Sequence, residues 1–130
     1  RVAESMYIFG GNSAGGSLND LWEYALYTHA WTQVVSAGGS PPHPRSSHSL
    51  SPLSNRLVVF GGDLANSLDS ALHCFDLQGR CWSCLAIGGV LPRARSSHAA
   101  IPCRGGFLIF GGRGLSNEHL NDTFLLRVWS

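Results

Sequence analysis

The chain has 130 residues, of which 44% are hydrophobic and 13% are charged. This composition supplies the core of about one folded domain and differs from that of a disordered segment. The formal charge of +1 comes from 9 basic and 8 acidic residues that are scattered singly, which argues against nucleic acid as a partner. The apolar runs are far shorter than the roughly 20 residues that a membrane-spanning helix needs, so we also expect no membrane insertion.

A short apolar run that ends in two glycines occurs three times, at residues 6–11, 57–62 and 107–112. Counted from the first glycine of each run, the intervals are 51 and 50 residues, so the chain is a tandem repeat. A continuous apolar run of this length is typical of a strand that is buried on both faces. We expect the glycine pair to end each of these strands.

The first unit is predicted to contain three strands, one loop and a long irregular connection. Residues 6–9 predict a strand, and residues 12–17 have the composition of a loop. Residues 18–24 alternate like a half-buried strand that is rich in aromatic side chains, and residues 31–35 predict its hairpin partner. Residues 36–44 contain three prolines and two glycines, so we expect an irregular connection to the next unit.

The second and third units repeat this pattern. In the first two units the step from an aromatic residue to a tryptophan is seven residues, from Tyr24 to Trp31 and from Phe75 to Trp82, which predicts the same hairpin twice. A strand of small polar residues, which begins Arg-Ser-Ser-His, precedes the second and third apolar runs. The strand of small polar residues lies at residues 45–50 and 95–98, and the strand that carries the aromatic residue lies at 71–75 and 120–124. In the second unit the loop lies at residues 63–67 and the long connection at 88–92.

Four short strands in each period, marked by Gly-Gly, an aromatic residue and a tryptophan, are typical of β-propeller blades. The whole chain resembles kelch repeats: an apolar run into Gly-Gly, a Leu-Asn-Asp strand with an aromatic residue, a tryptophan, and then Pro-Arg-x-x-His. The resemblance implies an all-β fold with blades of four antiparallel strands. In such blades the Arg-x-x-His strand is innermost and the tryptophan strand is outermost.

With that strand order, the chain would form a partial propeller of about 2.5 blades. Residues 5–36 would supply strands two to four of a first blade, residues 45–86 a complete second blade, and residues 95–129 strands one to three of a third blade. A propeller closes with about 4 to 8 blades, so we expect the remaining blades to come from the same chain or from another chain. The resemblance favours a segment of a longer kelch chain over two copies that meet head to tail.

The repeated histidines and the cysteines are the residues that could carry metal chemistry. His48 and His98 recur at one period, and we expect them to satisfy neighbouring backbone groups. Cys81 and Cys84 form a Cys-x-x-Cys, but residues three apart in a strand face opposite sides and cannot easily share a metal. A disulfide between Cys74 and Cys84 is conceivable, while buried free thiols are the default.

No pattern in the chain indicates catalysis. There is no Gly-x-Ser-x-Gly elbow and no pair of carboxylates placed for acid and base roles. Some propellers that resemble kelch proteins hold copper with tyrosines and histidines, but Tyr7 and Tyr24 occupy structural positions of the repeat. We therefore predict no catalytic residue, no metal and no cofactor. The alternative is a propeller enzyme or carbohydrate-acting domain whose active residues lie outside this segment.

The cellular compartment is weakly indicated. Residues 121–123 read Asn-Asp-Thr, which fits a glycosylation acceptor, but they coincide with the Leu-Asn-Asp mark of the repeat. A cytoplasmic location is slightly favoured over an extracellular one.

Two sets of loops vary while the strands repeat, and variable loops on a rigid scaffold are where recognition concentrates. The sets are the connections between second and third strands, at residues 12–17, 63–67 and 113–119, and the long connections between units. In kelch proteins that recruit partners these sets meet on one face. We therefore predict a protein interaction module of a scaffold or adaptor. The candidate contact residues in these loops are Asn12, Asn66, Arg113 and Asn117.

Arg45 and Arg95 are two further candidates. Their position resembles that of arginines that engage acidic peptide segments in the kelch adaptors of ubiquitin ligases, and a guanidinium binds a carboxylate at two points. In the other interpretation they bridge neighbouring blades through backbone carbonyls. The substitution Arg95→Glu separates the two roles: it would abolish partner capture with little effect on melting in the first, and would lower the melting temperature strongly in the second.

Overall fold

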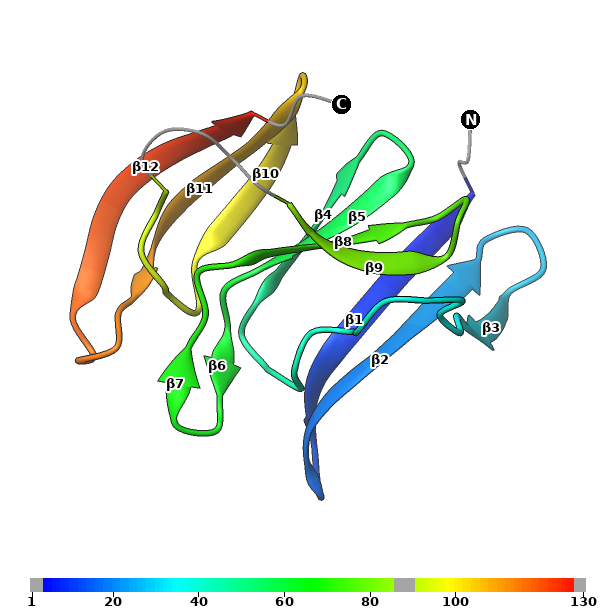
Figure 1. Ribbon diagram of the computed structural model, residues 1–130, viewed down its shortest axis with the longest axis horizontal. Coiled ribbons are helices and arrows are strands. Elements are labelled where there is room, and N and C mark those ends of the chain that lie inside the picture. The colour runs from blue at the N-terminus through cyan, green and yellow to red at the C-terminus, as the bar shows by residue number, and fades with distance from the viewer. Residues whose placement is uncertain (1–3, 86–90, 128–130) are drawn as a thin grey trace.

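The computed structural model describes residues 4–85 and 91–127, and these residues form β-strands and loops without a helix (Figure 1). The predicted all-β fold is confirmed. Since the described residues hold no helix, none of them forms an apolar helix of membrane-spanning length. The strands are β1 (Ser5–Ser13), β2 (Gly16–Ala25), β3 (Ala30–Gln33), β4 (Ser49–Leu53), β5 (Arg56–Phe60), β6 (Asp63–Leu64), β7 (Ser67–Leu68), β8 (Leu72–Asp76), β9 (Cys81–Leu85), β10 (Ala99–Cys103), β11 (Gly106–Arg113) and β12 (His119–Arg127).

The strands form three antiparallel sheets that follow the repeat, one for each unit. The first sheet has the order β1-β2-β3, the middle sheet β4-β5-β8-β9 and the third sheet β10-β11-β12. Strands β6 and β7 form a separate small hairpin within the middle unit. The middle sheet lies between the other two (Figure 1). We propose that each sheet is one blade, with the boundaries predicted from the sequence.

The core consists of two apolar layers, one on each side of the middle sheet. Towards the first sheet, Leu57 and Val59 of β5 pack against Phe9. Towards the third sheet, Val58 and Phe60 of β5 belong to the other layer. Successive residues of a strand point to opposite faces, so all four must be apolar, which explains the continuous run that the sequence shows.

The glycine pair does not end the strand in the first and third sheets, contrary to the prediction. Strand β1 continues to Ser13 and pairs with β2 down to Gly16, with a register shift between Phe9 and Gly11. The shift is a bulge, and Gly10 and Gly11 adopt φ angles of 67° and 100° that favour glycine. The segment predicted as a loop at residues 12–17 is therefore mostly a hairpin with a tight turn.

The innermost strand also starts later than predicted. Strand β4 begins at Ser49, whereas residues 45 and 46 make only isolated bridges, Leu18 to Arg45 and Ser46 to Asp63. Ser47 lies between these segments with a φ of 59°, a left-handed conformation that breaks a regular strand.

His48 and His98 each link one sheet to the sheet before it. His48 donates from Nε2 to the carbonyl of Phe9 at 2.7 Å, and Nε2 of His98 lies 2.8 Å from the hydroxyl of Ser49. The expected bond to a backbone group is thus present at His48, while His98 contacts a side chain. In both rings Nδ1 is buried and has no hydrogen-bond partner among the residues that the structure describes. Burial accordingly lowers the pKa of both, that of His98 to about 4.

Candidate protein-binding surface

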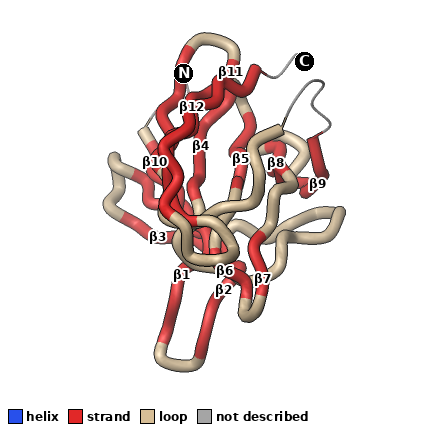
Figure 2. The backbone as a smooth tube through the Cα atoms, turned by 90° about the vertical axis from the view of Figure 1, so that its left-hand side faces the viewer, coloured by secondary structure: helices blue, strands red, loops and turns tan. Residues whose placement is uncertain are grey.

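Three connections between second and third strands lie on the same side of the molecule. They are the β1–β2 turn, the β6–β7 hairpin and the β11–β12 loop, and all three point to the lower edge of the view in Figure 1. The view turned by 90° also shows β1–β2 and β6–β7 projecting to this side (Figure 2). We call residues 12–17, 63–68 and 113–119 the hairpin row. The three members differ in sequence, whereas the strands that carry them repeat.

Local hydrogen bonds shape two members of the hairpin row. In the β1–β2 turn the hydroxyl of Ser13 donates to the carbonyl of Gly16 at 2.9 Å, and Ser17 donates to Asn12 at 3.0 Å. In the β11–β12 loop the N–H of Asn117 donates to the carbonyl of Gly114 at 3.0 Å. Asn117 adopts a φ of 67°, a conformation that asparagine tolerates better than most residues. The loops are therefore held by their own polar groups and leave their outer side chains exposed.

Two open hollows separate the members of the hairpin row. One, of about 420 Å³, lies between the β6–β7 hairpin and the β11–β12 loop and is lined by Asn66, Arg113 and Asn117 among others. The other, of about 440 Å³, lies between the β6–β7 hairpin, Ser17 and His43. His43 belongs to the long connection between units, so both variable loop sets border the same hollow. The β6–β7 hairpin forms one wall of each.

Arg113 joins two members of the row. Its Nη1 donates to Oδ1 of Asn117 at 2.9 Å, and its Nη2 lies 3.6 Å from Oδ2 of Asp63 in the β6–β7 hairpin. The side chains of Arg113 and Asp63 are both 40% exposed. Exposed pairs of this kind contribute about 0.2–1 kcal/mol to stability. The pair therefore holds the Arg113 side chain in position at the hollow more than it stabilises the fold.

The structure brings together three of the four loop residues predicted to bind a partner. Asn66, Arg113 and Asn117 border one hollow, whereas Asn12 is exposed on the β1–β2 ribbon outside both. Sequence reasoning missed Leu115, which is 72% exposed beside Arg113 in the β11–β12 loop. An apolar side chain within a loop of glycine and polar residues was the signal that could have pointed to it.

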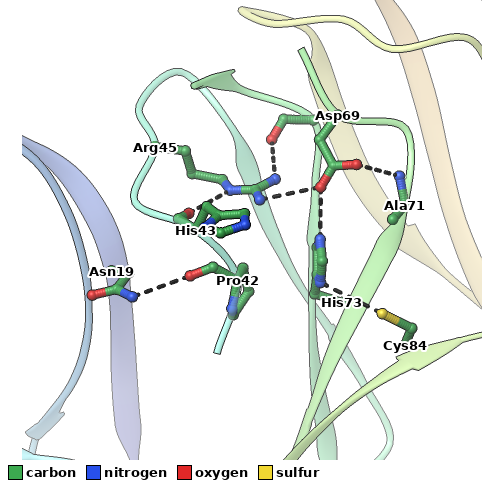
Figure 3. A network of polar contacts seen from close by, with 9 residues as sticks. Asn19, Pro42, His43, Arg45, Asp69, Ala71, His73 and Cys84 are labelled. Atoms are coloured by element: carbon green, nitrogen blue, oxygen red, sulfur yellow. Dashed lines mark hydrogen bonds and ion pairs between the residues drawn. The ribbon is translucent and has the colours of Figure 1, made fainter. Parts of the chain in front are cut away.

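Arg45 has a different environment from the loop residues, because its side chain is fully buried. Figure 3 shows its polar contacts. Its guanidinium donates to the carbonyl of His43 at 3.1 Å, to the carbonyl of Gly61 at 3.0 Å and to Oδ2 of Asp69 at 3.1 Å. Burial would raise the pKa of Asp69, but hydrogen bonds from His73, the Ala71 amide and Arg45 outweigh it, and the pKa falls below its ordinary value. The Arg45 side chain is thus tied to groups of its own unit, while its backbone N–H and carbonyl pair with Leu18 and Gly11 of the first unit.

Arg95 repeats this arrangement in the third sheet. It is also fully buried, and it donates to the carbonyl of Gly111 at 2.9 Å and to both carboxylate oxygens of Asp122. These hydrogen bonds lower the pKa of Asp122. The guanidinium contact with a backbone carbonyl lies within one unit, whereas the carbonyl of Arg95 itself accepts from the Gly62 amide of the preceding unit at 2.8 Å. Since neither Arg45 nor Arg95 is exposed, neither is part of the hairpin row.

The described residues contain no group of three or more histidine, cysteine or acidic side chains that could hold a metal ion. The four cysteines are free. The conceivable disulfide between Cys74 and Cys84 is absent because Cys74 lies opposite Ser83 in the β8–β9 pair, so the neighbouring Cys84 points to the other face.

Known proteins share this repeat. Leucine-zipper-like transcriptional regulator 1 of Homo sapiens is 32% identical over 61% of the chain and 10% of its own length. Acyl-CoA-binding domain-containing protein 5 of Arabidopsis thaliana is 43% identical over 63% of the chain and 13% of its own length. Kelch domain-containing protein 1 of Mus musculus is 37% identical over 50% of the chain and 16% of its own length. The chain therefore spans less than a fifth of each of these relatives.

The KLHDC2/KLHL20/DRC7 Kelch-repeats domain matches the whole chain, residues 1–130. Protein binding is typical of kelch repeats, which are generally not enzymes. The strands of the structure, with one antiparallel sheet for each period of the sequence, agree with this match. The chain belongs to the kelch-repeat family of β-propeller proteins.

Proposed function

We propose that the chain is a protein-binding module of a larger scaffold or adaptor, and that its partner binds at the hairpin row. The observation that carries this proposal is the placement of three connections of different sequence side by side, with two open hollows between them. The strands below them are paired and packed on both sides of the middle sheet, so the row stands on a rigid support. A rigid support lowers the entropy that binding would otherwise cost.

The side chains of the row suit a polar partner surface with one apolar contact. Asn66 and Asn117 offer amide groups that both donate and accept hydrogen bonds. Leu115 of the same hollow offers an exposed apolar side chain. Such a mixture of adaptable polar groups and an apolar anchor is typical of surfaces that recognise proteins.

Arg93 and Arg113 are the arginines that would bind acidic segments of the partner, because the guanidinium groups of Arg45 and Arg95 are buried. Arg93 is 60% exposed and pairs with Glu118 of the β11–β12 loop at 3.1 Å. Arg113 is 40% exposed and faces Asp63 at 3.6 Å. Because exposed ion pairs contribute little free energy, either arginine can release its own carboxylate and pair with a carboxylate of the partner.

Site-specific photo-crosslinking tests the location of the binding surface. A benzophenone side chain is introduced into the full chain at Asn66, in the hairpin row, and separately at Thr28, in the exposed β2–β3 turn. We expect a protein to be crosslinked from position 66. Once identified and purified, the same protein should also bind the unaltered chain when no crosslink is formed. Equal crosslinking of that protein from position 28, or binding that persists after the row is altered, would contradict the proposal.

A further inference from the structure

Outside the hairpin row, a cysteine, a histidine and an aspartate stand in line at the outer part of the middle sheet (Figure 3). Sγ of Cys84 lies 3.8 Å from Nδ1 of His73, and Nε2 of the same ring lies 2.7 Å from Oδ2 of Asp69. Cys84 is exposed, while the side chains of His73 and Asp69 are 16% and 24% exposed. A nucleophile beside a base that is oriented by a third group is the arrangement that activates nucleophiles.

The strand register explains why the cysteine and the histidine meet. His73 of β8 lies directly opposite Cys84 of β9, in the same ladder that sets Phe75 opposite Trp82. Directly opposed side chains of an antiparallel pair share one face and approach closely. The contact therefore follows from the pairing of the two strands.

The aspartate determines which ring nitrogen faces the sulfur as an acceptor. An ionised carboxylate only accepts hydrogen bonds, so Nε2 of His73 must donate to Asp69. In the neutral form of the ring, the other nitrogen, Nδ1, then carries the lone pair and accepts the thiol hydrogen of Cys84. Asp69 is itself held by the Ala71 amide at 2.9 Å and by Arg45 at 3.1 Å, so the ring has a fixed orientation.

Among the described residues, the other three cysteines have no such histidine and aspartate beside them and serve as internal references. Cys81, in the same strand, is exposed, and its thiol donates to the carbonyl of Gly79 at 3.3 Å, a group that accepts hydrogen bonds but no proton. Cys103 is exposed at the end of β10. Cys74 is buried, and burial raises the pKa of its thiol.

We propose that Cys84 is a site of covalent modification by low-molecular-weight disulfides, with His73 as the proton acceptor and Asp69 as a positioning residue. In this reaction Sγ of Cys84 attacks one sulfur of the disulfide while its proton moves to Nδ1 of His73. A new sulfur–sulfur bond forms as the original one breaks, and the departing thiolate takes up the proton from His73. Cys84 is oxidised to a mixed disulfide and the departing half of the reagent is reduced to a thiol.

Cys84 is exposed within the part of the chain that the structure describes, residues 4–85 and 91–127. Strand β9 is the edge strand of the middle sheet, and both faces of this sheet already pack against the first and third sheets. Trp82 of β9 is buried in the layer with the first sheet, yet Cys84, two residues further on, remains exposed. A small reagent can therefore reach the sulfur in the packed protein.

The test measures the rate of mixed disulfide formation at each cysteine of the full chain. The unaltered protein is treated with oxidised glutathione at neutral pH, quenched at intervals and mapped by mass spectrometry with fragmentation that separates Cys81 from Cys84. We expect Cys84 to react about ten-fold faster than Cys81 or Cys103, since general-base assistance acts at Cys84 alone. Equal rates at Cys81 and Cys84 would overturn the proposal without the need for any variant.

The variant His73→Gln then separates proton acceptance from packing. Glutamine retains an N–H donor for Asp69 but accepts no proton at neutral pH. We expect the rate at Cys84 to fall to that of Cys81, while the rates at Cys81 and Cys103 stay unchanged. A rate at Cys84 that is unaffected by this substitution would show that the histidine only packs against the sulfur.

Discussion

Arg95 holds Asp122 at two points, with 2.6 Å from Nη1 to Oδ1 and 2.9 Å from Nη2 to Oδ2. The same guanidinium donates to the carbonyl of Gly111. It thereby joins the chain just before β10 to the glycine pair of β11 and to β12. Arg45 makes the equivalent set of contacts with Gly61 and Asp69 in the middle sheet. A fully buried cation thus recurs at one place in two units and connects three segments of each.

The substitution Arg95→Glu tests whether this contact stabilises the fold. A glutamate at this position would face Asp122 and leave the Gly111 carbonyl without its donor. We expect the free energy of unfolding, measured by urea denaturation, to fall by about 3 kcal/mol or more.

The control for this substitution is Arg104→Glu, in the exposed β10–β11 turn. A surface substitution of this kind should change the free energy of unfolding by less than about 0.5 kcal/mol. Equal small effects at Arg95 and Arg104, together with loss of partner binding only at Arg95, would instead support the role in binding acidic peptides.

The histidines of the inner strands predict how stability depends on pH. Burial, the charge of Arg95 and the charge of His48 lower the pKa of His98 from 6.5 to about 4. Between pH 6.5 and about pH 4 the His98 ring therefore binds a proton in the unfolded chain but not in the folded chain. The stability from this group is complete above pH 6.5 and is lost as the pH falls towards 4, and it amounts to at most about 3 kcal/mol at about 1.4 kcal/mol for each pH unit.

The variant His98→Gln should flatten this dependence, measured as the free energy of unfolding between pH 6.5 and pH 4. Part of the slope should remain, because burial also lowers the pKa of His48. The carboxyl groups of Asp69 and Asp122 act at lower pH, since their pKa values lie below 3.8. The control is His119→Gln, at an exposed position, which should leave the slope of the unaltered protein unchanged. If His98→Gln also left that slope unchanged, the assignment would be contradicted.

Gly39 tests how tightly the connection between units packs on the middle sheet. It has a φ of 77°, and a methyl group added to it would lie 2.1 Å from the carbonyl oxygen of Trp82. Gly105 has a φ of 76° with open space around the same position. In thermal and urea unfolding we expect Gly105→Ala to cost about 1 kcal/mol for backbone strain alone. Gly39→Ala should cost about 2 kcal/mol more, because the carbonyl must move. Equal losses would show that the connection adjusts freely.

The period of the sequence was sufficient to predict the sheets. The Gly-Gly marks and the step from Phe75 to Trp82 determine which strands pair, and the structure has one antiparallel sheet for each unit. That the strand would pass through Gly10 and Gly11 was not predicted, because a glycine pair is equally compatible with a turn and with a bulge.

The environments of individual side chains were harder to predict. The sequence shows that Arg45 and Arg95 recur, but their burial depends on Asp69 and Asp122, which approach only through the folded chain. The contact between His73 and Cys84 could have been inferred, since the pairing of Phe75 with Trp82 sets His73 opposite Cys84. The position of Asp69 beside that ring could not, because it lies in an irregular segment before β8.

The affinity of the crosslinked partner for two matched variants tests the role of the hairpin row most directly. Asn66→Glu places a carboxylate at the wall shared by both hollows, where it repels acidic groups of the partner, and Thr28→Glu places the same group in the β2–β3 turn. Both variants should melt like the unaltered full chain. We expect isothermal titration to show that Asn66→Glu weakens binding at least about ten-fold, or about 1.4 kcal/mol, while Thr28→Glu leaves Kd unchanged. Unchanged affinity in Asn66→Glu, or an equal loss in Thr28→Glu, would contradict a partner site at the hairpin row.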